Sequence, residues 1–166
     1  MQKLLAAVDF SISTDAVLDQ AAYLAKALNA KLWVLHVASD ETQAIAYEPA
    51  QYSSYSPEFA GLPGDVQLAR DLSAEEIKRE HTHLLSISAK LRNDGLDAQA
   101  LLVKGDAAKI IIDKANDLDV EMIILGSHGH GLLHKALLGS VSESVIHHAR
   151  CTVTIVPASK SQAHHQ

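Results

Sequence analysis

Four small residues in the last quarter of the chain have the spacing of a phosphate-binding loop. Gly126 and Gly129 bracket two residues, and after nine more come Gly139 and Ser140, at the expected start of a helix. Glycine lets a ligand approach the backbone closely, and a helix N-terminus offers unpaired N–H groups and a partial positive charge. If the two segments converge, they would cradle phosphate oxygens without a lysine.

The same residues allow a second interpretation. The stretch Ser140-Val-Ser-Glu143 has the pattern of a capping box, in which Ser140 only caps the helix and the glycines only mark loop ends. Spacing alone does not choose between the two interpretations. They are partly compatible, because a serine cap uses its oxygen as an acceptor and leaves its proton available for a phosphate.

Asp9 directly follows the apolar run 3–8, which has the length of a buried strand. It could cap the following helix or contact a ligand at the edge of the sheet, and its place at a strand end favours the ligand contact. Other nucleotide motifs are absent from the sequence. There is no G-x-x-x-x-G-K-[ST] pattern, and the turn after the first strand lacks glycine, which argues against P-loop and dinucleotide folds.

Histidine and cysteine offer weaker signals. His128, His130 and His134 are close enough in sequence to bind a transition metal. No carboxylate or cysteine stands nearby to complete and orient such a set, so we expect phosphate contacts and no metal site. Cys151 is the single cysteine and cannot form an internal disulfide. It lies beside an apolar strand, where inert packing is expected.

Charge and composition exclude several functions. The formal net charge is −6 and no Lys/Arg cluster occurs, so nucleic acid is not expected as a partner. Any bound phosphate must then be held mainly by backbone N–H groups. The apolar N-terminal stretch stops at Asp9, too early for a signal peptide or a membrane span. We therefore expect a cytoplasmic protein with no membrane contact.

Hydrophobic patterning predicts alternating strands and helices. Short apolar runs predict strands at 3–8, 31–37, 98–103, 122–125 and 152–156. Helical spacing predicts helices over 13–28, behind a capping box at Ser73-Ala-Glu-Glu76, after a cap at Asp106, and over 140–148. This order predicts an α/β fold: a single domain with an open, parallel, five-stranded sheet and helices on both faces. Ligands of such sheets bind at the carboxyl ends of the strands.

Residues 39–71 stand apart from this pattern. They have no clear period and hold three of the four tyrosines, namely Tyr47, Tyr52 and Tyr55. A stretch of this length inside a domain is a lid, a docking patch or a disordered insert. We expect one domain over 1–158 that contains this insert, followed by a flexible tail at 159–166.

The sequence resembles the nucleotide-binding branch of the universal stress protein family. The family pattern G-x2-G-x9-G-[ST] is matched by Gly126, Gly129, Gly139 and Ser140. Three further family patterns are present: V-D-x-S at 8–11, L-H-V at 35–37 and V-P at 156–157. The resemblance extends from residue 3 to residue 157.

This resemblance implies a Rossmann-like sheet of the adenine nucleotide alpha hydrolase type, with strand order 3-2-1-4-5. It also implies a homodimer paired through the C-terminal strand. ATP, or AMP/ADP, would bind at the carboxyl ends of strands one and four. Mg²⁺ or Mn²⁺ could bridge the phosphates, with water in most coordination positions.

The family's site residues transfer onto matching positions of this chain. Asp9 would meet the ribose and adenine end of the nucleotide, and Ala7, Val8 and Val37 would line the base pocket. The phosphates would be held by the residues of the glycine motif and their neighbours: Gly126, His128, Gly129, Gly139, Ser140 and Val141. Leu125, directly before this motif, completes the predicted site.

One departure concerns nucleotide preference. The residue after the second glycine is often Arg or Lys in this family, and here it is His130. Losing that charge would weaken binding of ATP relative to AMP, or make it pH-dependent. The predicted function is a nucleotide-dependent sensor or regulator rather than an enzyme. The alternatives are a slow ATP hydrolase that uses His128 and His130, and a nucleotide-free dimeric scaffold that acts through the insert.

Overall fold

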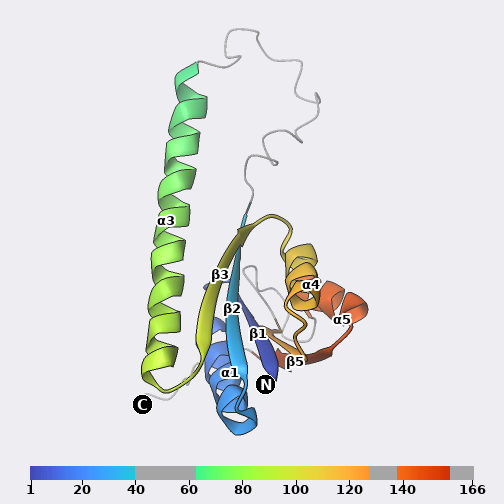
Figure 1. Ribbon diagram of the computed structural model, residues 1–166. Helices are drawn as coiled ribbons and strands as arrows, with labels where there is room; N and C mark the ends of the chain where they lie inside the picture. Colours follow the sequence, from blue (N-terminus) through green and yellow to red (C-terminus); the bar gives the residue numbers. More distant parts are fainter. Residues whose placement is uncertain (40–62, 128–137, 158–166) are drawn as a thin grey trace, which may run out of the picture.

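A computed structural model describes residues 1–39, 63–127 and 138–157, except for the side chains of residues 63–70. The elements alternate along the chain as predicted (Figure 1). In order they are β1 (Lys3–Val8), α1 (Thr14–Leu28), β2 (Lys31–Ala38), α3 (Pro63–Asn93), β3 (Ala98–Lys104), α4 (Ala107–Asp117), β4 (Met122–Gly126), α5 (Ser140–His148) and β5 (Thr152–Val156).

The five strands form one parallel sheet in the order β3-β2-β1-β4-β5. This confirms the predicted fold class and strand order. Strand β1 lies at the centre, where Leu4 is in register with Leu32 of β2 on one side and Met122 of β4 on the other. The strand order therefore reverses between β1 and β4, and the carboxyl ends of these two strands are where a ligand site is expected.

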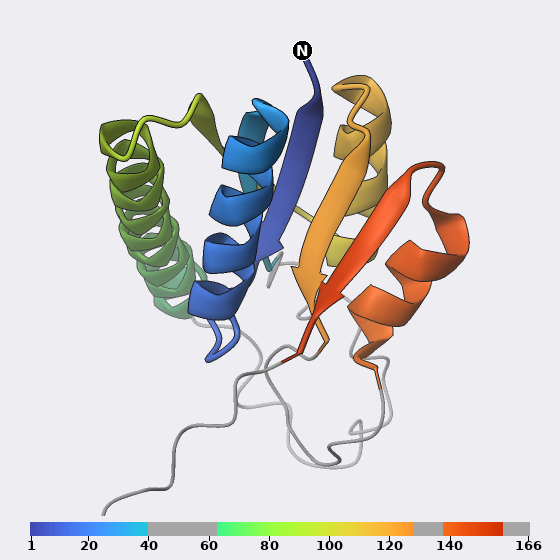
Figure 2. The same ribbon diagram turned by 90° about the horizontal axis from the view of Figure 1, so that it is seen from below.

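Side chains of the central strand alternate between two cores. Leu4, Ala6 and Val8 pack with α1 and α3 on one face of the sheet, while Leu5 packs with α4 and α5 on the other. Figure 2 shows these two helical layers on opposite sides of the strands. Leu4 and Leu5 are at most 1% exposed, and full burial of each contributes roughly 1.5–3 kcal/mol. The apolar strands are unbroken because both faces are covered.

Helix ends follow the local chemistry that the sequence predicts. Helix α1 ends at Asn29, which adopts the left-handed conformation with φ 49°. Helix α3 ends before Gly95, whose φ of +86° favours glycine. Helix α4 begins after Asp106, whose carboxylate accepts a hydrogen bond from the Lys109 N–H at 2.8 Å.

The predicted start of α3 is wrong. We expected a capping box at Ser73-Ala-Glu-Glu76, but the helix begins at Pro63 and runs through those residues. Proline suits a first helical position, and the alanine, leucine and arginine that follow favour a helix, so the capping pattern here marks no boundary. Residues 63–71, assigned to the insert, are the first turns of α3. Residues 40–62 of the insert, which include its tyrosines, lie outside the described residues.

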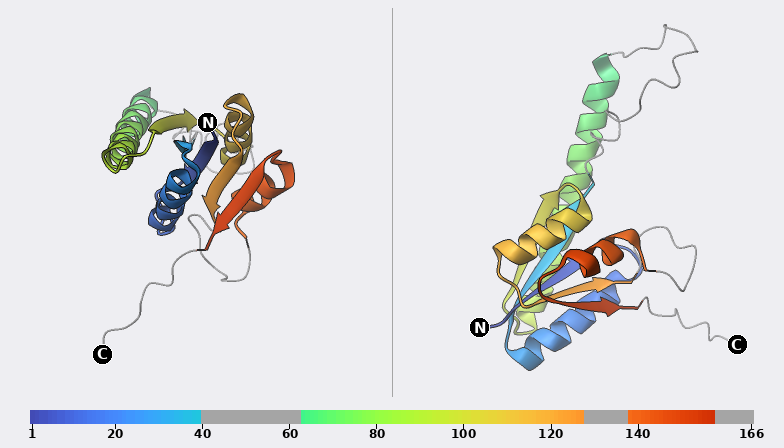
Figure 3. Two further views of the ribbon diagram at one scale, coloured as in Figure 1. Left: turned by 60° about the horizontal axis from the view of Figure 1, so that its bottom comes forward. Right: turned by 90° about the vertical axis from the view of Figure 1, so that its right-hand side faces the viewer.

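Helix α3 has 31 residues, so it is roughly 46 Å long at 1.5 Å per residue. Its N-terminal half extends past the carboxyl edge of the sheet (Figure 3, right). None of the helices in the described ranges combines the length and apolarity needed to cross a membrane. The predicted tail at 159–166 lies outside the description, so the domain boundary stays a prediction.

Candidate functional site

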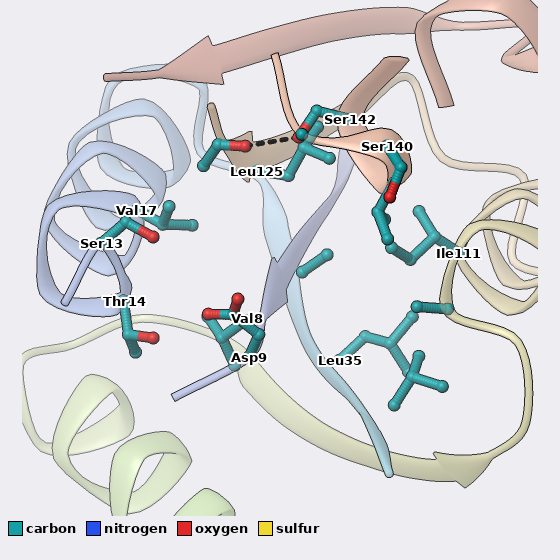
Figure 4. Close-up of a pocket in the computed structure, with 16 residues that line it drawn as sticks. Val8, Asp9, Ser13, Thr14, Val17, Leu35, Ile111, Leu125, Ser140 and Ser142 are labelled. Atoms are coloured by element: carbon teal, nitrogen blue, oxygen red, sulfur yellow. Dashed lines mark hydrogen bonds between the residues drawn. The ribbon is translucent and has the colours of Figure 1, made fainter. Parts of the chain in front are cut away.

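A pocket of about 350 Å³ lies at the carboxyl edge of the sheet, where the strand order reverses (Figure 4). Its floor is formed by the ends of β1, β2 and β4, and its walls by the first turns of α1, α4 and α5. The volume falls within the range of small-molecule sites. The fold therefore provides a ligand-sized cavity where this type of sheet is expected to bind.

The structure brings most of the predicted site residues to this pocket. The residues that line it are Ala7, Val8, Asp9, Val37, Leu125, Gly126, Gly139, Ser140 and Val141. His128 and Gly129 lie outside the described residues, as do His130 and His134.

Several lining residues were not predicted from the sequence. They come from the first turns of α1 and α4, from β2 and from α5, and they are Ser13, Thr14, Val17, Leu35, Ala107, Ile111 and Ser142. A positional signal was available for some of them, because α1 and α4 each begin directly after the carboxyl end of a parallel strand. First-turn residues of such helices are candidates for any ligand at that edge.

The described parts of the glycine motif, at Gly126 and at Gly139 and Ser140, meet at one end of the pocket. The Gly139 N–H donates to the Ser127 carbonyl oxygen at 2.8 Å. The Ser142 hydroxyl donates to the Gly126 carbonyl oxygen at 2.7 Å, the dashed line in Figure 4. These bonds hold the start of α5 against the end of β4, as a converging phosphate cradle requires.

The capping-box interpretation of Ser140 is wrong. Gly139 occupies the cap position, and the Glu143 N–H donates to the Gly139 carbonyl oxygen at 2.9 Å, so Ser140 is the first residue of the helix. Gly139 has φ −67°, which any residue can adopt, so the backbone does not require glycine here. The N–H groups of Ser140, Val141 and Ser142 have no hydrogen-bond partner within the described part of the chain.

Asp9 lies on the opposite side of the same pocket. Its Oδ1 accepts a hydrogen bond from the Ser11 N–H at 3.0 Å, which folds the chain into a short turn after β1. The cap position of α1 is Ser13, so the interpretation of Asp9 as the helix cap is wrong. Asp9 is the only charged residue among the described residues that line the pocket.

His36 fixes the end of β1 that carries Asp9. Its ring Nδ1 is 2.8 Å from the Val8 carbonyl oxygen, and the Phe10 ring stacks on it with centroids 4.2 Å apart. Its Nε2 is 3.3 Å from a carboxylate oxygen of Glu80 on α3, within ion-pair distance but not aligned as a hydrogen bond. The sequence marked His36 only as part of a motif, and the structure shows it as an anchor for the turn.

Among the described residues, two groups outside the pocket have shifted pKa values. Partial burial raises the pKa of the Cys151 thiol, which agrees with the predicted packing role because the thiol is the less reactive form. A side-chain hydrogen bond to Asp113, together with its charge, raises the pKa of Lys109. The positive charge of Lys109 is thus paired within α4 instead of facing the pocket.

Comparison with known proteins establishes the family of this chain. The model of the universal stress protein family matches residues 1–157. The chain belongs to this family. Universal stress protein A homolog 1 of Coxiella burnetii is 31% identical over 92% of this chain and 94% of its own length. Universal stress protein Sll1388 of Synechocystis is 29% identical over 93% and 96%, respectively.

Solved universal stress protein structures share the fold. UspA from Lactobacillus plantarum is 21% identical with a TM-score of 0.73, over 93% of this chain and 97% of that one. A universal stress protein in complex with cAMP is 19% identical with a TM-score of 0.61, over 95% and 98%. One from Archaeoglobus fulgidus in complex with dAMP is 19% identical with a TM-score of 0.60, over 94% and 98%.

Proposed function

We propose that this universal stress protein binds an adenine nucleotide in the pocket between α1, α4 and α5 and acts as a nucleotide-dependent regulator. One observation carries the proposal. Gly126, Gly139 and Ser140 of the glycine motif line a single pocket together with Asp9, and the first N–H groups of α5 have no partners there within the described part of the chain. Uncovered amides at a helix N-terminus are suited to phosphate.

The lining chemistry suggests an orientation for the nucleotide. Leu35, Val37 and Ile111 form an apolar wall for the adenine. Asp9 accepts from the ribose, and the segment from Gly139 to Val141 holds the phosphates. The cAMP and dAMP complexes of two proteins with the same fold support an adenine nucleotide as the ligand.

Within the described part of the pocket the phosphates would be held by backbone groups, because no Lys or Arg lines that part. ATP, ADP and AMP are all candidates. A Mg²⁺ or Mn²⁺ ion bound with ATP would be held mainly by the phosphates and water. Slow hydrolysis of ATP is the alternative function, and it would depend on His128 and His130, which lie outside the described residues.

Calorimetric titration tests this function with ATP, ADP, AMP and adenosine. We expect AMP or ATP to bind at a single site per chain, and adenosine to bind more weakly because it makes no contact with α5. Absence of binding by all three nucleotides at millimolar concentration would overturn the proposal.

A matched pair of substitutions on α5 locates the phosphate contact. Ser140 lines the pocket and Ser144, one turn further along, does not. Ser140→Asp should weaken AMP binding by about 10- to 100-fold, since a hydrogen bond to a charged group contributes about 1.5–3 kcal/mol and the new carboxylate repels the phosphate. Ser144→Asp should leave AMP binding unchanged, and neither change should affect adenosine. Equal losses in both variants would show a general effect on α5 and not a phosphate site.

We also propose that two copies of the chain pair through β5. This strand forms an edge of the sheet and pairs with β4 on one side only within the described residues. An open edge is a template for pairing with another strand. Light scattering during size-exclusion chromatography should give the mass of two chains, and the mass of one chain would contradict the proposal.

A further inference from the structure

The first residue of α1 carries a buried hydroxyl group without a partner. Thr14 is 7% exposed, and its Oγ1 makes no hydrogen bond to any described residue. The residue lines the pocket, and Figure 4 shows its hydroxyl on the side that faces Asp9. A buried hydroxyl that lacks a hydrogen-bond partner is unfavourable. A bound ligand would supply that partner.

The local fold does not use this hydroxyl. The Thr14 N–H donates to the Ser11 carbonyl oxygen at 3.1 Å, and the Val17 N–H donates to the Ser13 carbonyl oxygen at 3.0 Å. The hydroxyl groups of Ser11 and Ser13 bond to each other at 2.9 Å. Ser13, not Thr14, occupies the cap position. The turn and the helix start are therefore complete without the Thr14 side chain.

The charge of the surroundings selects the chemistry of the ligand group. Asp9 brings a carboxylate to the same end of the pocket, which disfavours a phosphate there. The α5 end contributes glycine, serine and valine and no charged side chain to the described lining. An anionic group thus fits at α5, and a neutral, hydroxyl-bearing group fits between Asp9 and Thr14. A sugar hydroxyl can donate to the carboxylate and accept from the threonine at the same time.

We propose that Thr14 is a second ribose contact, whose Oγ1 donates to a ribose hydroxyl while that hydroxyl donates to Asp9. This inference rests on the proposed nucleotide function and adds a determinant of sugar specificity. The Thr14 hydroxyl distinguishes ribonucleotides from an analogue that lacks the contacted hydroxyl.

The test is a double-mutant cycle in which the Thr14 hydroxyl of the protein and a ribose hydroxyl of the ligand are removed separately and together. AMP, 2′-deoxyAMP and 3′-deoxyAMP are titrated into the wild type, Thr14→Val and Thr14→Ser. Thr14→Val should weaken AMP binding by about 3- to 10-fold, the size expected for one neutral hydrogen bond. One of the two deoxy analogues should bind the wild type and Thr14→Val equally, which identifies the contacted hydroxyl. Thr14→Ser keeps the hydroxyl and should retain the preference for AMP.

Thermal unfolding of the nucleotide-free proteins provides an independent readout. Thr14→Val replaces an unpartnered hydroxyl by a methyl group, so its Tm should equal or exceed that of the wild type. A lower Tm would show that the hydroxyl has a partner inside the protein and would overturn the inference.

The binding outcomes separate this inference from the proposed function. Wild-type protein that binds none of the three nucleotides would reject the function and the inference together. Wild-type protein that binds AMP, with Thr14→Val binding it equally well, would reject only the ribose contact. An equal loss of affinity for all three ligands in Thr14→Val would also reject it.

Discussion

Helices α4 and α5 lie on the same face of the sheet and begin at the same edge, but their N-termini differ. Helix α4 begins after Asp106, whose carboxylate accepts from the Lys109 N–H. Helix α5 begins after Gly139, and no side chain among the described residues caps it. Both first turns reach the pocket, through Ala107 and Ser140. The third N–H group of α4 is therefore bonded to its own cap residue, whereas the first three N–H groups of α5 have no partner within the described part of the chain.

The difference has a cost in stability. A side-chain cap contributes about 1 kcal/mol to a helix, and α5 lacks that contribution although serine stands next to Gly139. Departures from local stability rules are expected at functional sites. We propose that the start of α5 lacks a side-chain cap because its first N–H groups bind phosphate.

The substitution Gly139→Asp would give α5 a side-chain cap like that of α4, and we expect it to have the largest effect on AMP binding. An aspartate can adopt the φ of −67° at this position, and its carboxylate would occupy the amides in place of a phosphate. AMP affinity should fall by about 10- to 100-fold while the Tm of the free protein stays equal or rises. Titration of AMP and adenosine measures the effect, with adenosine as the control. Unchanged AMP affinity in this variant would mean that α5 does not hold the phosphate.

The substitution Asp9→Asn sharpens the assignment of the other end of the pocket. The amide oxygen can still accept from the Ser11 N–H, so the turn is kept while the negative charge is removed. AMP affinity should fall by about tenfold, because hydrogen bonds to an ionised acceptor are roughly twice as strong as neutral ones. The exposed Asp15 lies in the first turn of α1 outside the pocket, and Asp15→Asn is the matched control. Tighter AMP binding by Asp9→Asn would instead place the phosphate at this end.

The substitution Asp106→Ala should have the smallest effect on binding. Removing the cap of α4 should lower the free energy of unfolding by about 1 kcal/mol, measured by urea denaturation. AMP affinity should stay unchanged, because the α4 start holds no phosphate. A clear loss of AMP affinity in Asp106→Ala would contradict the proposed difference between α4 and α5.

The fold was largely predictable from the sequence, for a physical reason. Strands buried on both faces are short apolar runs, so all five were found with ends that differ by at most one residue. Strand order is not encoded in periodicity, and it was predicted only through the family resemblance. The start of α3 was missed because a capping pattern such as Ser73–Glu76 can also occur inside a helix whose preceding residues favour it.

The site was predictable only where its residues form a motif. Asp9, Gly126 and Gly139 were found because they follow strands or precede a helix at fixed spacing. Thr14 and Ile111 were missed, since the packing of α1 and α4 against opposite faces of the sheet brings them to the pocket. The choice between Gly139 and Ser140 as the cap depended on which carbonyl accepts from the Glu143 N–H, and the sequence does not reveal that.

The most direct test of the central claim follows backbone amides by NMR during titration with AMP and with adenosine. We expect AMP to shift the amide signals of Ser140, Val141 and Ser142 strongly and adenosine to leave them in place. The Lys109 amide, already bonded to Asp106, should respond little to either ligand. If AMP and adenosine shift the α5 amides equally, or AMP leaves them unmoved, the phosphate does not bind at α5.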